Sequence, residues 1–290
     1  MRRINVCPIC SSGELSHHSE VIDHSISKEK FTLSQCLNCD FLFTNPQPKA
    51  GDLWKYYESV DYVSHSKTSQ GFINYWYRRV QKLNLQLKYN ALKYYVPRGT
   101  WLDYGAGGGD FVRFISQKRI NIIGLEPSET ARINAHKDGI KLKPTEYLNS
   151  IENESLACIT LWHVLEHIHN FQEVVTSLLY KLQSGGLLVF ALPNHLSYDS
   201  QIYGANWAAL DVPRHLWHFT QTDIQNIATQ HSLTLVKTKG MLFDSFYVSL
   251  LSEKYQSGSK IKGFWNGLVS NLKASKEQNP FSSQIYVLRK

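Results

Sequence analysis

The chain has 290 residues, a formal net charge of +7, and a composition that is 42% hydrophobic and 12% aromatic. This composition is sufficient for a packed core and excludes a disordered chain. No apolar run reaches the ~18 residues that a membrane-spanning helix needs. No apolar signal region precedes the first cysteine, so we expect a cytoplasmic protein without a membrane span. The two flanks are basic and the middle is acidic. Basic flanks are compatible with nucleic acid, a membrane surface or an ordinary solvated surface.

Two Cys-x-x-Cys pairs stand near the N-terminus, and they consist of Cys7, Cys10, Cys36 and Cys39. Four thiolates in two close pairs suit tetrahedral Zn²⁺, and a hairpin within residues 18–35 would bring the pairs together. Disulfides are not expected in a reducing compartment. Because four protein sulfurs leave no open coordination position, the metal is structural. We therefore predict a zinc-ribbon-like module over residues 1–46.

Residues 47–98 are predicted to form a helical linker or cap. Apolar side chains recur at alternating helical spacings over residues 70–95. They are Ile73, Trp76, Val80, Leu83, Leu87, Ala91 and Tyr94. We expect one long amphipathic helix that packs this face beside a sheet and ends at Pro97.

Residues 101–109 predict a strand, a tight turn and a helix that starts near Asp110. The apolar run ends on Asp103, and Gly105, Gly107 and Gly109 follow. Such a turn lies at the carboxyl end of a strand, where open α/β sheets bind ligands. A dinucleotide fingerprint would place its third glycine at position 110, which is Asp110. The carboxylate of Asp103 also disfavours pyrophosphate, so the pattern favours a nucleoside that carries positive charge. The competing reading is a tight turn without a ligand.

From residue 99 onward strands and helices alternate, which predicts a doubly wound parallel sheet over 99–290. A second strand ends at Glu126, where an acidic residue accepts hydrogen bonds from ribose hydroxyls. The alternative for Glu126 is a charge at a helix entry. A helical insert over about 241–280 is expected to pack on the sheet, with a surface amphipathic helix or a partner-binding element as the alternative. A last strand follows at 284–288.

Histidines gather in two places. His163 and His167 follow a buried strand, but the zinc-helix order His-Glu-x-x-His is not met, so we expect no metal there. A long loop is predicted over 197–219, and it carries His215 and His218. Loops of this length inside a compact domain are usually functional. Contact with a ligand and a hydrogen-bonded structural role are both open for these histidines.

The glycine stretch after Asp103, the acidic turn at Glu126 and Pro127, and residues 185–193 resemble motifs of class I S-adenosylmethionine-dependent methyltransferases. The resemblance covers about residues 99–240 and the last strand. It implies a Rossmann-like, doubly wound sheet of seven strands with the last strand antiparallel, and S-adenosylmethionine as cofactor. Carried over by position, the cofactor-binding residues are Asp103, Gly105, Gly107, Gly109, Glu126, Pro127 and His163.

The N-terminal cysteine segment and residues 213–220 are also similar to bacterial methyltransferases of polysaccharide and sugar-nucleotide gene clusters. These include sugar C-methyltransferases with an N-terminal zinc module. The resemblance implies a small-molecule acceptor, such as a sugar or a sugar nucleotide, methylated on carbon or oxygen. It also implies acid–base histidines, for which the candidates are His215, His218 and His167.

Two other functions are compatible with the sequence. A zinc ribbon with basic flanks suits an rRNA or tRNA methyltransferase, although lysine and arginine are scattered rather than arranged in a stripe. The second is a role as a non-catalytic, zinc-bearing scaffold that keeps a vestigial cofactor-binding fold. The sequence does not specify the methylated atom or the oligomeric state.

Overall fold

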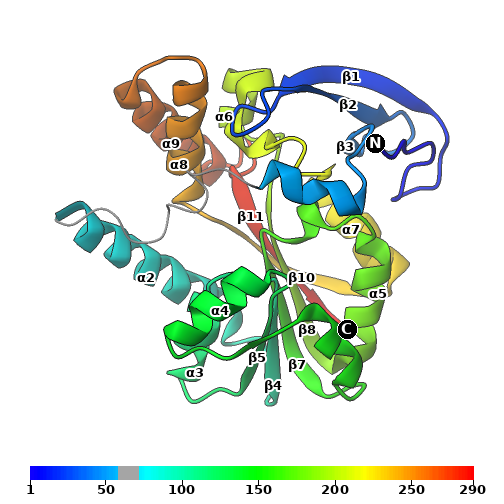
Figure 1. Cartoon of the computed structure of the whole chain (residues 1–290), viewed down its shortest axis with the longest axis vertical. Helices are drawn as coiled ribbons and strands as arrows, with labels where there is room; N and C mark the ends of the chain where they lie inside the picture. Colours follow the sequence, from blue (N-terminus) through cyan, green and yellow to red (C-terminus); the bar gives the residue numbers. More distant parts are fainter. Residues whose placement is uncertain (58–71) are drawn as a thin grey trace.

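The computed structural model describes residues 1–57 and 72–290, with side chains from Arg79 onward in the second range. A seven-stranded sheet forms the centre, and a four-stranded sheet lies beyond its carboxyl end (Figure 1). The central sheet has the order β10-β11-β8-β7-β4-β5-β6. Its strands are β4 (Thr100–Tyr104), β5 (Ile122–Leu125), β6 (Leu142–Lys143), β7 (Leu156–Trp162), β8 (Leu182–Pro193), β10 (Thr234–Gly240) and β11 (Ser283–Arg289).

The central sheet confirms the predicted fold class. β4 pairs in parallel with both β5 and β7, and β7 pairs in parallel with β8. β11 is antiparallel to both of its neighbours, β8 and β10. The chain order of the strands changes direction at β4, and ligands of open α/β sheets bind at such a switch point.

Helices cover both faces of this sheet, because alternate residues of its buried strands point to opposite sides. In β8, Leu188 and Phe190 belong to one core cluster and Leu187 and Val189 to another. Figure 1 shows α2 and α3 on one side and α5 and α7 on the other. The helices of the two layers are α2 (Phe72–Leu92), α3 (Asp110–Ser116), α4 (Glu129–Lys137), α5 (Phe171–Lys181) and α7 (Gln221–Gln230).

Short helical turns complete the connections: η1 (Ala50–Tyr56), η2 (Thr145–Ser150), η3 (Leu165–His167), η4 (Gly204–Asn206) and η5 (Ala208–Leu210). Thr220 and Asp223 have the spacing of a capping box, which predicts a helix from residue 221, and α7 begins at Gln221 because the two residues form that reciprocal box.

The small sheet has the order β1-β2-β3-β9. Its strands are β1 (Leu15–Ile22), β2 (Lys30–Cys36), β3 (Leu42–Thr44) and β9 (Trp217–His218). β1 and β2 form the predicted hairpin. β9 comes from much later in the chain and pairs with β3. The core is continuous across this junction, since the ring of Phe41 lies 6.1 Å from that of Trp217 and 5.4 Å from that of Phe219.

The long helix before the central sheet forms as predicted, but part of its predicted buried face is wrong. Val80 and Leu83 are exposed, and Tyr94 beyond the helix end is 82% exposed. Leu85, Tyr89 and Leu92 pack against the sheet instead, with Ala91. The buried face of α2 is therefore rotated about the helix axis relative to the predicted face, because packing against Trp101 and Phe114 decides which residues are buried. The predicted positions Ile73 and Trp76 lie outside the described side chains.

The stretch predicted as a long loop is folded. It forms α6 (Tyr198–Tyr203), two short helical turns and β9. The Ser197 hydroxyl accepts from the Ser200 amide and starts α6. Trp207 is buried, and its ring nitrogen donates to Asp199 over 2.7 Å. These buried contacts hold the backbone of this segment in one conformation, so it is not a mobile loop.

The predicted insert forms α8 (Asp244–Tyr255) and α9 (Lys260–Ser275). It does not lie on the sheet. The two helices pack on each other, on α6 and on the turn at 208–210, and Figure 1 shows them beyond the carboxyl end of the strands. Within 1–57 and 72–290, no helix has the length and apolar character to cross a bilayer.

Candidate functional site: the carboxyl edge of the central sheet

The glycine turn after β4 has the backbone that the sequence predicts. Gly105, Gly107 and Gly109 have φ values of 77°, 54° and 78°, in the left-handed region that favours glycine. A Cβ at Gly105 would lie 2.5 Å from a methyl of Val164. Among the described residues, a Cβ at Gly107 would meet nothing within 4 Å. The turn is therefore packed against Val164 at Gly105 but open at Gly107, where a ligand can approach the backbone.

The carboxylate of Glu126 closes over this turn. One oxygen accepts from the amide of Gly107 over 2.7 Å, and the other accepts from the amide of Ser128 over 2.9 Å. Arg132 holds the turn from outside by donating to the carbonyl oxygens of Glu126 and Pro127. Each carboxylate oxygen keeps a second lone pair, so Glu126 can still accept hydrogen bonds from a diol.

Asp103 is buried at the end of β4, 2% exposed. Thr160, its register partner on β7, donates its hydroxyl over 2.6 Å. Burial raises the pKa of Asp103 to about 7, although Thr160 and Lys88 pull it down. A buried carboxyl with this pKa gains from a positive charge beside it.

Lys88 already lies at this edge, although no motif in the sequence marks it. Its ammonium lies 4.5 Å from the ring centroid of Trp162. Burial lowers the pKa of Lys88, while Asp244, Asp103 and Asp110 raise it. The helical pattern of 70–95 places Lys88 on the helix but gives no signal that α2 turns it toward Asp103.

His163 connects β7 to α8. Its backbone is left-handed, with φ 57°, and its amide donates to the carbonyl of Ala191. Nδ1 lies 3.5 Å from an oxygen of Glu166, and Nε2 lies 3.2 Å from an oxygen of Asp244. Burial lowers the pKa of His163, but the two carboxylates outweigh it and raise the pKa to about 9. His163 is therefore an imidazolium at neutral pH.

Glu166, His167 and His215 converge beside His163. One ligand atom of each lies within 4.8 Å of the others. Nδ1 of His167 lies 3.0 Å from the carbonyl oxygen of Arg214, and Nδ1 of His215 lies 2.8 Å from that of Ala209. A carbonyl oxygen only accepts, so Nδ1 of each ring donates to it, and in the neutral form of either ring Nε2 keeps a lone pair.

The carboxylate of Glu166 is buried, and within residues 1–57 and 72–290 neither oxygen has a hydrogen-bond partner, although His163 is ion-paired with one of them over 3.5 Å. Burial raises its pKa, but His163 outweighs burial and holds the pKa of Glu166 below its usual range. Burial lowers the pKa of His167 to about 4, so this ring is neutral. The Tyr57 hydroxyl lies 3.0 Å from Nδ1 of His167. Asp244 reaches this site from α8, and no local motif of the sequence marks it.

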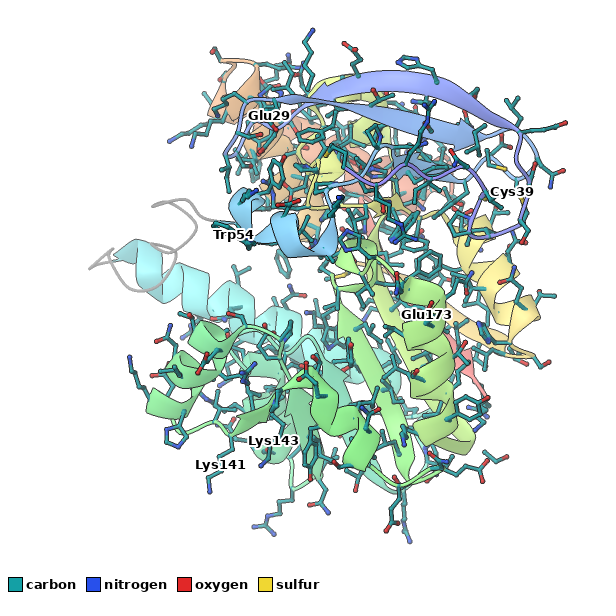
Figure 2. The ribbon with its side chains drawn as sticks, turned by 45° about the vertical axis from the view of Figure 1, so that its right-hand side comes forward. Glu29, Cys39, Trp54, Lys141, Lys143 and Glu173 are labelled. Carbon is teal, nitrogen blue, oxygen red and sulfur yellow. The ribbon has the colours of Figure 1, made fainter. Side chains whose placement is uncertain are left out.

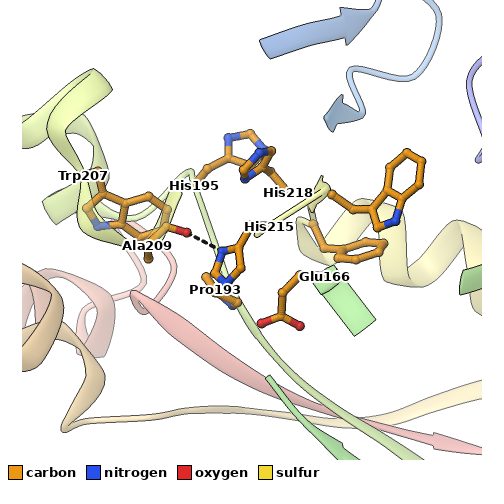
Figure 3. Close-up of a pocket in the computed structure, with 9 residues that line it drawn as sticks. Glu166, Pro193, His195, Trp207, Ala209, His215 and His218 are labelled. Atoms are coloured by element: carbon orange, nitrogen blue, oxygen red, sulfur yellow. Dashed lines mark hydrogen bonds between the residues drawn. The ribbon is translucent and has the colours of Figure 1, made fainter. Parts of the chain in front are cut away.

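His218 lies near this cluster but inside the small sheet. It pairs with Leu42 across β9 and β3, and its Nε2 lies 3.4 Å from the Thr44 hydroxyl. Figure 3 shows a small pocket that His218 lines together with His195, His215 and Glu166. Burial holds the pKa of His218 well below its usual range.

The four N-terminal cysteines converge as a separate cluster, with one sulfur of each within 4.8 Å of the others. The Sγ atoms of Cys7 and Cys39 lie 3.6 Å apart, and those of Cys10 and Cys36 lie 3.5 Å apart. Each pair sits on an equivalent turn, since the amides of Ser11 and Asp40 donate to the carbonyls of Cys7 and Cys36. In Figure 2, Cys39 and Glu29 mark opposite ends of the small sheet. This arrangement fits a tetrahedral thiolate site for zinc.

A profile of the methyltransferase domain family matches residues 75–238. A ubiquinone biosynthesis O-methyltransferase of Salmonella arizonae is 28% identical over 126 residues, which are 39% of this chain and 51% of that protein. The match thus spans about half the length of this curated relative.

Several solved structures share the fold. The crystal structure of an S-adenosylmethionine-dependent methyltransferase from Archaeoglobus fulgidus has a TM-score of 0.51 at 18% identity, over 72% of this chain and 94% of that one. A cyclopropane synthase from Mycobacterium tuberculosis has a TM-score of 0.54 at 14% identity, over 84% and 99%. At this identity the structures show the fold alone, whereas the profile match covers more than half of the chain. The chain belongs to the methyltransferase domain family.

Proposed function

We propose that the protein transfers a methyl group from S-adenosylmethionine to a small, polar acceptor, such as a sugar, a sugar nucleotide or a related biosynthetic intermediate. The observation that carries this proposal is the convergence of Glu166, His167 and His215 just past β7, at the carboxyl edge of the central sheet. Two imidazole lone pairs and one carboxylate offer only acceptors. Such a group suits an acceptor that must lose a proton when it is methylated at oxygen or carbon.

For the cofactor we propose roles by position. Gly105, Gly107 and Gly109 let the cofactor approach the backbone, and the open space over Gly107 supports this. Glu126 receives the ribose hydroxyls, and Pro127 shapes the turn beside the adenine. The buried carboxyl of Asp103 favours the cationic methionine part of the ligand.

We propose that His163 lines the cofactor pocket as a positioning residue rather than a base. Its ring is positively charged and is held between Glu166 and Asp244. The positive charge of His163 also favours a role of Glu166, His167 and His215 in proton transfer over a role as metal ligands. A divalent cation there would lie beside an imidazolium, and His163 already supplies the positive charge that a metal would bring.

Among the three candidate bases we favour His215, assisted by His167. Methyl transfer is mostly a matter of positioning, and a base adds about 10²–10⁴-fold when the acceptor needs deprotonation. Both rings are fixed by bonds from Nδ1 to backbone carbonyls, which leave Nε2 available. His218 is the weakest candidate because its ring lies within the small sheet against Thr44.

We also propose a zinc-bearing module at 1–46, a linker and cap at 47–98, and a catalytic domain at 99–290. The four-sulfur cluster supports the module. The contribution of β9 to the small sheet ties the module to the catalytic domain.

The test is methyl transfer from radiolabelled S-adenosylmethionine to a panel of nucleoside diphosphate sugars and phenolic intermediates. We compare the wild type with His215→Asn, with Glu126→Gln and with the control His231→Asn, which lies outside the site. We expect His215→Asn to lower the turnover by about 10²-fold with unchanged cofactor affinity. Glu126→Gln should weaken the cofactor about tenfold or more. Full turnover in His215→Asn would refute the base, and undiminished cofactor binding in Glu126→Gln would refute the ribose contact.

A further inference from the structure

α9 packs on the protein through its smallest residues. Its buried positions are Gly263, Gly267, Ser270, Asn271 and Ala274. A Cβ at Gly267 would lie 2.8 Å from the Cα of Phe246, and one at Gly263 would lie 3.0 Å from the Cα of Leu250. α8 and α9 therefore touch backbone to backbone, and the contact leaves no room for large side chains.

The large apolar side chains of α9 consequently point away from the protein. Ile261 is 71% exposed, Trp265 57%, Leu272 53% and Phe264 51%. Ile261, Trp265 and Leu272 follow helical spacing and form one stripe along the helix. On α8, Tyr247 is 63% exposed as well. This pattern is the reverse of an ordinary surface helix, which buries its apolar face.

The charges around this stripe have one sign. Exposed lysines of the two helices and their ends surround it, namely Lys254, Lys260, Lys262 and Lys276. Between residues 244 and 276 the acids are Asp244 and Glu253. Asp244 pairs with His163, and Glu253 is 1% exposed, accepts from Tyr203 and pairs with Lys262 over 3.4 Å, so both acids are already paired inside the protein. The first exposed acid is Glu277, just past the end of α9.

We propose that the outer face of α9, with Tyr247 of α8, docks on an anionic lipid surface. Large apolar side chains flanked by lysines are typical of helices that lie in the membrane interface. Anionic headgroups attract the lysines, and the apolar stripe enters the boundary between headgroups and acyl chains. The hairpin is described over its full length, and none of its helices spans a bilayer, so the contact is peripheral.

The same charges disfavour a second copy of the chain as the occupant. In a twofold dimer each patch meets its own copy, so the lysines of one protomer would face those of the other. An anionic surface neutralises these charges instead. Figure 1 shows α8 and α9 on the outside of the molecule, beyond the carboxyl end of the sheet. Because α8 starts at Asp244 beside His163, the docked hairpin of α8 and α9 would lie next to Glu166, His167 and His215, where we propose that the acceptor binds.

The test is co-sedimentation of the full chain with vesicles of phosphatidylcholine alone or mixed with phosphatidylglycerol. We expect binding to the mixed vesicles that falls steeply with salt, and little binding to phosphatidylcholine alone. The variant Ile261→Ser/Trp265→Ser/Leu272→Ser should bind at least tenfold more weakly. Lys260→Gln/Lys276→Gln should lose part of the affinity and most of the salt dependence. The matched control is Tyr94→Ser/Tyr180→Ser, which removes two rings that are 82% and 63% exposed elsewhere.

Calorimetry with S-adenosylmethionine establishes that each variant is folded. The proposal is overturned if wild type does not bind the mixed vesicles, or if the triple serine variant binds as well as wild type. It is also overturned if light scattering shows a wild-type dimer that the triple variant loses while vesicle binding is absent. In that case the face is an interface between copies.

Discussion

Nε2 of His163 lies 3.2 Å from a carboxylate oxygen of Asp244, which joins the residue after β7 to the first residue of α8. This contact links the cofactor edge of the sheet to the helical hairpin that carries the exposed apolar stripe. It also places a partly buried positive charge next to Glu166. The pH dependence of stability should report this link.

The substitution Asp244→Asn should reduce stability near neutral pH. The folded-state pKa of His163 is raised from 6.5 to about 9. Its stabilisation is therefore complete below pH 6.5 and is lost as the pH rises through about 9. We expect the variant to lose about 1–2 kcal/mol at acidic to neutral pH, after allowance for partial exposure, and to match wild type at alkaline pH. Urea unfolding across this range measures it, with the exposed Glu152→Gln as control. A constant difference across the range would contradict the assignment.

Cofactor binding should depend on the ionisation of Asp103. Burial raises its pKa to about 7 in the unliganded protein. A cationic ligand favours the ionised form, so affinity for S-adenosylmethionine should rise with pH up to about 7 and then level off. The change should approach tenfold per pH unit on the acidic side. Calorimetry in buffers with different ionisation enthalpies should show proton release on binding. Asp103→Asn should bind weakly at every pH, and a wild-type pH dependence in this variant would exclude Asp103.

Replacement of a zinc ligand should unfold the small sheet. Cys36 is fully buried in the same core as Phe41. Cys36→Ser should release one zinc ion per chain and increase hydrogen exchange over residues 1–46, since structural zinc supplies about 10–16 kcal/mol of apparent binding free energy. Cys158→Ala is the matched control, because Cys158 is also buried but lies in β7. Wild-type zinc content in Cys36→Ser would contradict the four-cysteine site.

Arg214 should stabilise the contact between the turn of the β1–β2 hairpin, which contains Asp23, and the segment before β9. Its guanidinium lies 2.9 Å from Asp23 and 2.7 Å from Asp211, and Asp23 is almost fully buried. Arg214→Met leaves Asp23 without its cation, so we expect a loss of about 3–5 kcal/mol in urea unfolding.

This pair also has a pH signature. Burial raises the pKa of Asp23, but Arg214 and turn amides outweigh burial and lower it. The pair's stabilisation is present above pH 3.8 and is lost as the pH falls through the lower folded pKa. Acid unfolding of Arg214→Met should begin at higher pH than in wild type. Arg214→Lys, which keeps the charge, is the control and should recover part of the stability. Unchanged acid unfolding in Arg214→Met would show that Asp23 does not depend on Arg214.

The parts of the fold that the sequence predicts depend on local patterns. The positive-φ glycines after Asp103 mark a strand end, and the alternation of strands and helices predicts the central sheet. The two Cys-x-x-Cys pairs predict the sulfur cluster because their spacing is short and chemically specific. The capping box at Thr220 predicts the start of α7 to the residue.

The parts that the sequence does not predict depend on tertiary contacts. Lys88 and Asp244 reach the site from α2 and α8, whose rotation is decided by packing rather than by periodicity. The two-residue strand β9 is too short to show any pattern. For α9, an apolar stripe normally predicts a buried face, but the close glycine contact with α8 turns that stripe outward.

The pairing of β3 with β9 has a consequence for the order in which the protein can fold during synthesis. The cysteine hairpin leaves the ribosome before β9, yet Phe43 of β3 pairs with Trp217 of β9. Until that residue emerges, β3 keeps an open edge and the rings of Phe41 and Phe43 lack their cover. Domains that fold as the chain emerges normally complete N-terminal parts early. Here the small sheet is complete only after β9, in the last third of the sequence, has been synthesised. Zinc bound by the four cysteines can keep the β1–β2 hairpin folded until then.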